Sequence, residues 1–140
     1  MSNLRDTALK LAERLRSRAN AIDALTRDPI QEVTTSTLDD ILENNDLVIL
    51  YFTAEWCGPC ISFLATLREV AIETNDTRIF WGKVDVDRSF TIADRYGVNH
   101  IPSMLILYKG RVIDSIVGTL QKDKLISKIK QYINTYLKKQ

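Results

Sequence analysis

The chain has 140 residues, of which 45% are hydrophobic and 26% charged, a composition typical of one globular domain. Its longest apolar run, residues 47–53, is far shorter than the roughly 18 residues of a membrane-spanning helix. Residues 1–27 and 121–140 are basic, whereas residues 28–120 carry 14 acidic and seven basic side chains. A nucleic-acid-binding domain would concentrate its basic residues on the folded body instead. We therefore expect neither a nucleic-acid nor a membrane partner.

The N-terminal segment is a poor match to targeting sequences. Residues 4–25 mix arginines with leucines and lack the apolar centre of a secretory signal. An organelle transit peptide is the alternative, but it should be poorer in acidic residues than a segment holding Asp6, Glu13 and Asp23. We expect a cytoplasmic protein.

The same segment has the periodicity of a helix. Apolar residues recur every three or four positions from Leu4 to Leu25, which predicts an amphipathic helix. Because the residue before a proline avoids the helical conformation, Asp28 and Pro29 indicate a boundary.

We accordingly predict a helical extension at residues 1–29 and a second unit at residues 30–140. The apolar stripe of the extension needs a surface to cover it. We expect it to pack on its own domain. Dimerisation, docking of a partner and contact with an acidic surface are the alternatives.

The rest of the chain alternates between strand and helix patterns. Residues 47–53 are continuously apolar, as in a strand whose sheet is covered on both faces. A short turn separates residues 104–108 from 112–117, so these two strands must be antiparallel neighbours. The prediction is an α/β fold with a mixed central sheet flanked by helices. Its expected elements are a strand at 31–35, a helix capped by Ser36 or Thr37, a strand at 47–53, a helix from Ile61 to Ile72, a strand at 79–86, a helix at 90–96, strands at 104–108 and 112–117, and a final helix holding Leu125 to Leu137.

The two cysteines, Cys57 and Cys60, stand where the buried strand ends and a helix begins. Free amides and the dipole at a helix N-terminus stabilise a thiolate, so the pKa of Cys57 should fall from ~8.5 toward ~7. Cys57 is the predicted nucleophile, and Cys60, one turn inward, is the predicted resolving thiol. Pro59 suits the first helical turn, and Gly58 leaves room for another chain to approach.

Two other interpretations of the cysteine pair are a structural disulfide and half of a metal site. The chain has one histidine and two cysteines, so it cannot build a four-ligand thiolate zinc site by itself. We expect no metal. Trp56, beside the cysteines, is interpreted as a contact residue at the edge of the site rather than as a packing residue.

Several short segments together resemble the thioredoxin family. The match runs in order from about Val33 to Leu137. The matching residues are Ala54 to Cys60, Lys83 to Asp87, Tyr96 to Val98, Ile101 to Ser103, Gly110 and Gly118.

This resemblance implies a thioredoxin fold and reversible dithiol–disulfide exchange on protein substrates, with no bound cofactor besides the Cys57–Cys60 disulfide. It implies a role in cellular redox balance and electron transport, with recharging by a thioredoxin reductase that carries flavin and draws on NADPH. It also implies a cis bond between Ile101 and Pro102, beside Cys57. The implied substrate groove consists of Trp56, Gly58, Pro59, Ile101 and Pro102.

The chain departs from the family at three positions. Tyr51 replaces a buried aspartate that the family uses to move a proton at the resolving thiol. Lys83 keeps the family's lysine without that acidic partner, so we expect it to snorkel or to pair with Asp85. Tyr51 and Lys83 are therefore predicted to modulate the thiols. Ile61 replaces the usual basic residue and makes the surface more apolar.

Two alternative functions stay open at this point. A raised redox potential would make the protein a disulfide isomerase or oxidase. A thioredoxin-fold binding module would instead dock a partner through its basic helices and leave the dithiol incidental.

Overall fold

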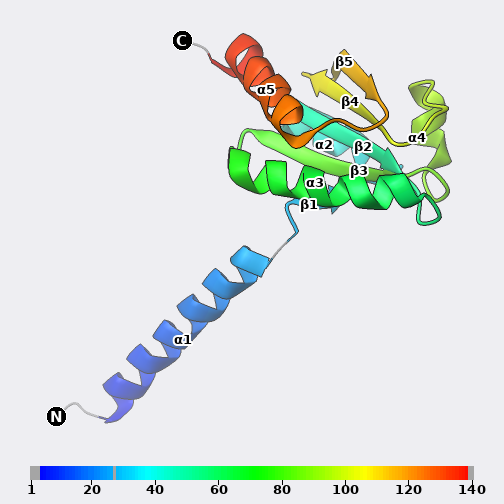
Figure 1. The fold of residues 1–140 in the computed structure, drawn as a ribbon. Helices are drawn as coiled ribbons and strands as arrows, with labels where there is room; N and C mark the ends of the chain where they lie inside the picture. The colour runs from blue at the N-terminus through cyan, green and yellow to red at the C-terminus, as the bar shows by residue number, and fades with distance from the viewer. Residues whose placement is uncertain (1–3, 27, 139–140) are drawn as a thin grey trace.

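The computed structural model describes residues 4–26 and 28–138. Over these residues the chain forms a five-stranded mixed sheet with helices on both faces, and one further helix that extends away from it (Figure 1). The elements are α1 (Leu4–Thr26), β1 (Ile30–Glu32), α2 (Leu38–Asn44), β2 (Leu47–Thr53), α3 (Gly58–Thr74), β3 (Ile79–Asp85), α4 (Phe90–Arg95), β4 (Ser103–Tyr108), β5 (Arg111–Val117), α5 (Lys122–Tyr132) and a π-helical turn η1 (Ile133–Leu137).

The order of strands and helices confirms the sequence-based prediction, with differences at the element ends. β1 stops at Glu32 because Thr34 and Thr37 bond to each other in a turn, the Thr34 amide donating to Thr37 Oγ1 over 2.9 Å. Thr37 precedes α2, but its side chain makes no capping hydrogen bond to that helix. The final helix turns π-helical from Ile133 onward instead of continuing as an α-helix.

The strands lie in the order β1-β3-β2-β4-β5, with β1, β3 and β2 parallel and β4 and β5 antiparallel. β2 is the central strand, and all seven of its residues are buried. This confirms that the continuous apolar run is a strand covered on both faces.

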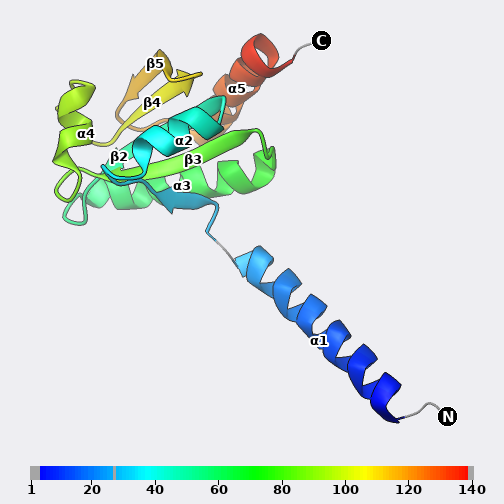
Figure 2. The ribbon, with the colours of Figure 1, turned by 180° about the vertical axis from the view of Figure 1, so that it is seen from behind.

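Side chains of β2 point alternately into two core layers. Leu47, Ile49 and Tyr51 pack with α3 and α5, whereas Leu50 and Phe52 pack with α2 and α4. The two views from opposite sides show these helix pairs covering opposite faces of the sheet (Figures 1 and 2). The core therefore holds the C-terminal end of β2 between two packed layers.

α1 does not join either layer. Both views show it directed away from the sheet (Figures 1 and 2), and its four leucines between residues 4 and 18 are between 52% and 89% exposed. The expectation that its stripe packs on its own domain is therefore wrong for these side chains. The side chains of Ala19, Ile22 and Leu25, which were counted in the stripe, lie outside the described residues. Among the residues that are described, no helix combines the length and apolarity needed to cross a membrane.

Candidate active site

The cysteine turn lies at the edge of the sheet where the parallel strands β2 and β3 both end. Thr53 pairs with Asp85 in the register, and the Val86 amide donates to the Thr53 carbonyl over 2.9 Å. Because the carboxyl ends of parallel strands meet at one edge, the loop after β3 lies beside the loop after β2. Two loops that are about 30 residues apart in the sequence thus form one surface.

Cys57 is the N-cap residue of α3, and it forms a disulfide with Cys60 across a Cα–Cα distance of 5.2 Å. Its sulfur accepts a hydrogen bond from the Cys60 amide over 3.2 Å. Cys57 is 6% exposed and Cys60 is 0% exposed, so the outer sulfur is the one nearer to solvent. Pro59 stands in the first turn, as predicted. In the reduced protein, the same amide and the helix dipole would stabilise a thiolate on Cys57.

The loop before β4 covers the cysteines from the other side. Ile101 packs against a small buried cluster of Ala54, Cys57 and Cys60. The bond from Ile101 to Pro102 is cis, which confirms the expectation drawn from the family resemblance. The Pro102 carbonyl accepts from the Gly118 amide over 2.8 Å, so the residue after β5 helps to hold this loop.

Trp56 is 70% exposed, yet its ring is held in place. Its Nε1 donates to Asp87 Oδ2 over 2.7 Å, and in the same loop Arg88 Nη2 donates to Glu55 Oε1 over 3.2 Å. Sequence reasoning did not assign Asp87 or Arg88. The available signal was their position directly after β3, at the edge of the sheet where Cys57 also lies.

Tyr51 is fully buried beneath the cysteine turn. Its hydroxyl donates to the Cys60 carbonyl over 2.7 Å, and its ring packs against Phe63, with 5.8 Å between ring centroids. Burial raises the pKa of this hydroxyl far above its ordinary range. Tyr51 therefore stays protonated and acts as a hydrogen-bond donor to the backbone of α3, not as a base.

Lys83 does not pair with Asp85, contrary to one of the two expectations for it. Asp85 instead accepts from the amides of Asp87 and Arg88, at 2.9 and 3.3 Å, and so closes the loop after β3. Lys83 is half-buried and lines a hollow of about 240 Å³ that also borders Glu55. This position fits the alternative expectation of snorkelling, in which the aliphatic part of the Lys83 side chain is covered and its ammonium group reaches solvent.

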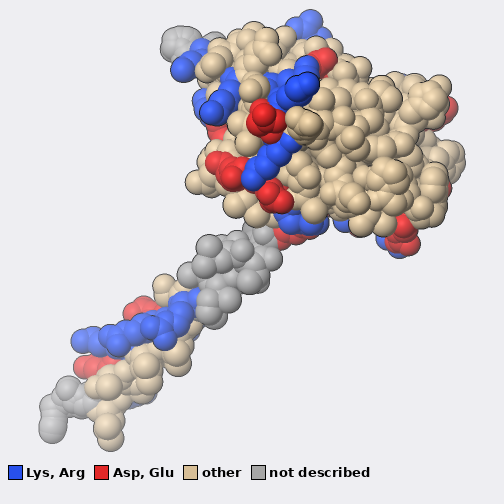
Figure 3. All heavy atoms as spheres, in the orientation of Figure 1, with Lys and Arg blue, Asp and Glu red and all other residues tan. Residues whose placement is uncertain are grey.

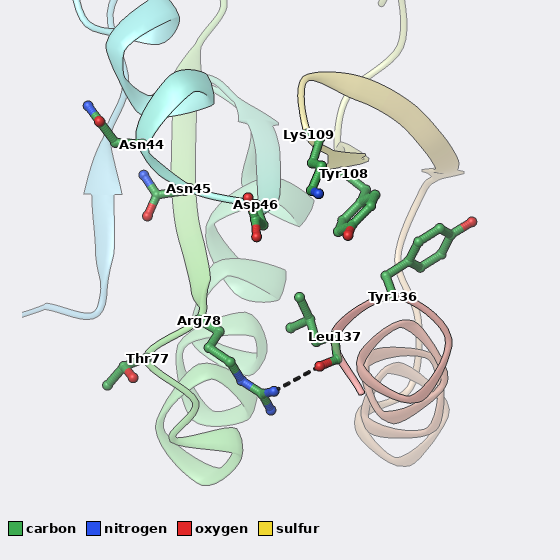
Figure 4. A pocket seen from close by; sticks show the side chains of 9 residues that line it. All are labelled: Asn44, Asn45, Asp46, Thr77, Arg78, Tyr108, Lys109, Tyr136 and Leu137. Carbon is green, nitrogen blue, oxygen red and sulfur yellow. Dashed lines mark hydrogen bonds between the residues drawn. The ribbon is translucent and has the colours of Figure 1, made fainter. Parts of the chain in front are cut away.

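A second hollow, of about 480 Å³, lies at the opposite end of the sheet (Figure 4). Arg78 on its wall is already engaged: it pairs with Asp76 at 2.8 Å and donates to the Leu137 carbonyl over 3.1 Å. Neither cysteine borders this hollow.

Comparison with known proteins decides the family. The family model described as Thioredoxin matches residues 29–131. A thioredoxin of Chlorobaculum thiosulfatiphilum is 36% identical over 94 residues, which cover 67% of this chain and 86% of that protein. The chain belongs to the thioredoxin family. A thioredoxin of Griffithsia pacifica is 30% identical over 105 residues, covering 75% of this chain and 95% of its own length. The solved structure of a mutant thioredoxin from Halobacterium salinarum superposes with a TM-score of 0.65 at 30% identity, covering 76% of this chain and 95% of that one.

The chain is therefore a protein-disulfide oxidoreductase with a thioredoxin fold, and Cys57 and Cys60 are its redox-active disulfide. Members of this family typically reduce protein disulfides, are themselves reduced by thioredoxin reductase, and work without a bound cofactor.

Proposed function

We propose that this thioredoxin works as a reductant, with Cys57 as nucleophile and Cys60 as resolving thiol. The Cys57 thiolate attacks one sulfur of a substrate disulfide, forming a mixed disulfide and releasing the other substrate sulfur as a thiolate. Cys60 then attacks Cys57, which restores the Cys57–Cys60 disulfide and releases the second substrate thiolate. Two electrons pass from the dithiol to the substrate. The observation that carries the assignment is the hydrogen bond from the Cys60 amide to the Cys57 sulfur at the start of α3.

The proposed substrate groove consists of Trp56, Gly58, Pro59, Ile101 and Pro102. Gly58 and Pro59 are exposed, and a Cβ placed on Gly58 would meet nothing within 4 Å, so a substrate chain can approach closely here. Trp56 is held at its edge by Asp87. Ile61, 55% exposed in the first turn of α3, would extend the apolar contact surface.

Tyr51 and Lys83 are proposed to modulate the thiols in different ways. Tyr51 holds the Cys60 carbonyl and so positions the first turn of α3. Lys83 lines the hollow that reaches from β3 to Ile61. The hydrogen bond found at a sulfur in this oxidised form comes from the Cys60 amide and from neither of these side chains, so both are proposed as positioning or electrostatic residues.

The proposed electron donor is a thioredoxin reductase that uses flavin and NADPH, the proposed substrates are protein disulfides, and the proposed compartment is the cytoplasm, where this chain would serve redox balance and electron transport. Family membership supports the donor and the substrates. The division into an extension at 1–29 and a domain at 30–140 is part of the same proposal. A homodimer through the N-terminal helix stays a prediction.

Serine variants test the order of the two thiols. Cys57→Ser should abolish the reduction of insulin disulfides, because no nucleophile remains. Cys60→Ser should instead accumulate a mixed disulfide, which non-reducing electrophoresis and mass spectrometry detect. Full insulin reduction by the Cys57→Ser variant would contradict the mechanism.

A redox titration of the Cys57–Cys60 pair tests the direction of electron flow. The alternative of an isomerase or oxidase has one observation in its favour, since Tyr51 stands where the family has an ionisable acid. We expect a potential near the ~−270 mV that is typical of thioredoxin. A potential of ~−180 mV or above would support the alternative and overturn the proposed direction.

A further inference from the structure

α1 is a helix of 23 residues whose described side chains have no surface to cover them. Most helical stability in proteins comes from packing an amphipathic face, not from intrinsic propensity. Leu4, Leu11 and Leu15 are each more than half exposed. The arrangement of the charges around these leucines indicates what covers them.

A helix turns by roughly 100° per residue, which places Leu4, Leu11 and Leu15 within about 40° of arc. We refer to these three residues as the leucine stripe. Basic side chains border it on both sides, within roughly 40–120° of its centre. Arg14 and Arg18 lie along one border, and Arg5 and Arg16 lie along the other.

The acidic side chains that the structure describes in α1 lie on the far side of the helix, and that of Asp23 lies outside the described residues. Glu13 is about 180° from the centre of the leucine stripe, and Asp6 is about 160° from it. Figure 3 shows basic side chains in a row along α1, with acidic side chains beside the row and a surface of uncharged residues next to it. Over its described side chains the helix thus has an apolar face, basic borders and an acidic back.

Contrary to the expectation of no membrane partner, which rested on the lack of a membrane-spanning segment, we propose that α1 lies along the surface of a membrane that contains anionic lipids. The leucine stripe would enter the boundary between headgroups and acyl chains, parallel to the membrane plane. The bordering arginines are long enough to keep their apolar stems against that boundary while their guanidinium groups reach the lipid phosphates. The acidic residues face water, away from the anionic surface. Charge complementarity therefore matches each face of the helix to its surroundings.

A second copy of the chain fits this pattern less well. When two helices pair along an apolar seam, the residues that border the seam meet their counterparts across it, and opposite charges favour the pairing. Both borders of the leucine stripe are basic among the described side chains, so pairing would bring arginines together. An anionic lipid surface removes that repulsion.

Vesicle co-sedimentation of the full-length, oxidised protein tests the proposal. We expect binding to vesicles of phosphatidylserine mixed with phosphatidylcholine, and at least about tenfold weaker binding to phosphatidylcholine alone, because each basic residue near an anionic surface raises binding about fivefold. Binding should weaken as salt is raised, since salt screens exposed charges.

A matched pair of variants locates the contact. Leu11→Gln combined with Leu15→Gln should weaken binding at least about tenfold, because two leucines no longer enter the interface. Leu9→Gln removes an equally large exposed side chain, about 140° from the stripe centre, and should leave binding unchanged. Insulin reduction and the unfolding transition of the domain should be the same in all three proteins, which shows that the domain is folded.

Three results would overturn the proposal. Equal binding to both kinds of vesicle would show that the helix does not recognise anionic lipids. An equal loss of binding in Leu9→Gln would show that the leucine stripe is not the face that contacts the membrane. The third result combines two observations: the protein binds neither kind of vesicle, and sedimentation velocity shows a dimer that the double variant dissociates. The stripe would then be a dimer interface instead.

Discussion

At the scale of single residues, Tyr51 shows how this chain differs chemically from its family. A buried carboxyl group at this position could exchange a proton with the resolving thiol. The Tyr51 hydroxyl is held protonated by burial, which raises its pKa, and it donates to the Cys60 carbonyl. It therefore stabilises the start of α3, and any proton that Cys60 exchanges must travel by another route.

Tyr51→Phe separates these two roles, because it removes the hydroxyl and keeps the ring. We expect the free energy of unfolding to fall by about 1 kcal/mol, the net contribution of a typical hydrogen bond. Chemical denaturation measures this loss. The pH profile of insulin reduction should keep its shape, since Tyr51 does not titrate in the working range. A shifted profile would show that Tyr51 takes part in proton transfer.

At the scale of secondary structure elements, β3 depends on a close approach between its backbone and the side chains of its neighbours. Gly82 is buried in the middle of this strand, facing the layer that packs with α2 and α4. A Cβ at this position would lie 2.5 Å from Val33 Cγ2 and 3.1 Å from Phe80 Cε1. Both distances are shorter than ordinary contacts, so the glycine is required by packing.

Gly82→Ala should consequently lower the free energy of unfolding by about 1–3 kcal/mol, the usual effect of overpacking a core. Gly58→Ala is the matched control for stability, because a Cβ there meets nothing within 4 Å. Chemical denaturation of the two oxidised variants gives the comparison. A stable Gly82→Ala protein would mean that Val33 moves aside at little cost.

At the scale of the whole molecule, a few polar contacts join segments that are distant in sequence. Arg78, directly before β3, donates to the Leu137 carbonyl near the C-terminus (Figure 4), and its side chain is held by an ion pair with Asp76, two residues before it. Asp28, two residues before β1, accepts from Arg68 of α3 over 3.0 and 3.1 Å. These contacts tie both ends of the domain to the sheet and to α3.

Asp76→Asn gives a pH-dependent test of the ion pair that holds the Arg78 side chain. Hydrogen bonds from the Arg78 side chain hold the pKa of Asp76 below its ordinary value of 3.8. Because the pKa of Asp76 is lower in the folded protein than in the unfolded chain, its charge stabilises the fold at pH values above 3.8. This stabilisation is lost as the pH falls through the pKa of the folded state. The variant should therefore be slightly less stable at neutral pH, since the exposure of Arg78 weakens the ion pair, and the difference should vanish in acid.

Asp39→Asn serves as the control for that experiment. Asp39 pairs with Arg95 at 3.0 Å, but both side chains are more than half exposed, so we expect almost no change in stability at any pH. Denaturation curves recorded across acid and neutral pH compare the two variants. A difference for Asp76→Asn that persists in acid would point to packing and not to charge.

The order of strands and helices, the buried central strand and the position of Cys57 and Cys60 between a strand and a helix were all predictable from the amino-acid sequence. These features depend on the spacing of apolar residues and on the residues at helix ends, which are properties of near neighbours. The Ile101–Pro102 cis bond was also predicted, but by resemblance to a family.

Which distant groups meet became clear only in the folded molecule. Trp56 donates a hydrogen bond to Asp87, and Tyr51 donates one to the Cys60 carbonyl. Asp85 accepts a hydrogen bond from the backbone of its own loop and does not pair with Lys83. These outcomes depend on the register between strands and on the geometry of loops, which apolar spacing does not specify. The same holds for α1. Its periodicity predicted the helix and its apolar stripe, but the fold of the domain left the described leucines of α1 exposed, because the two faces of the sheet were already covered by the other helices.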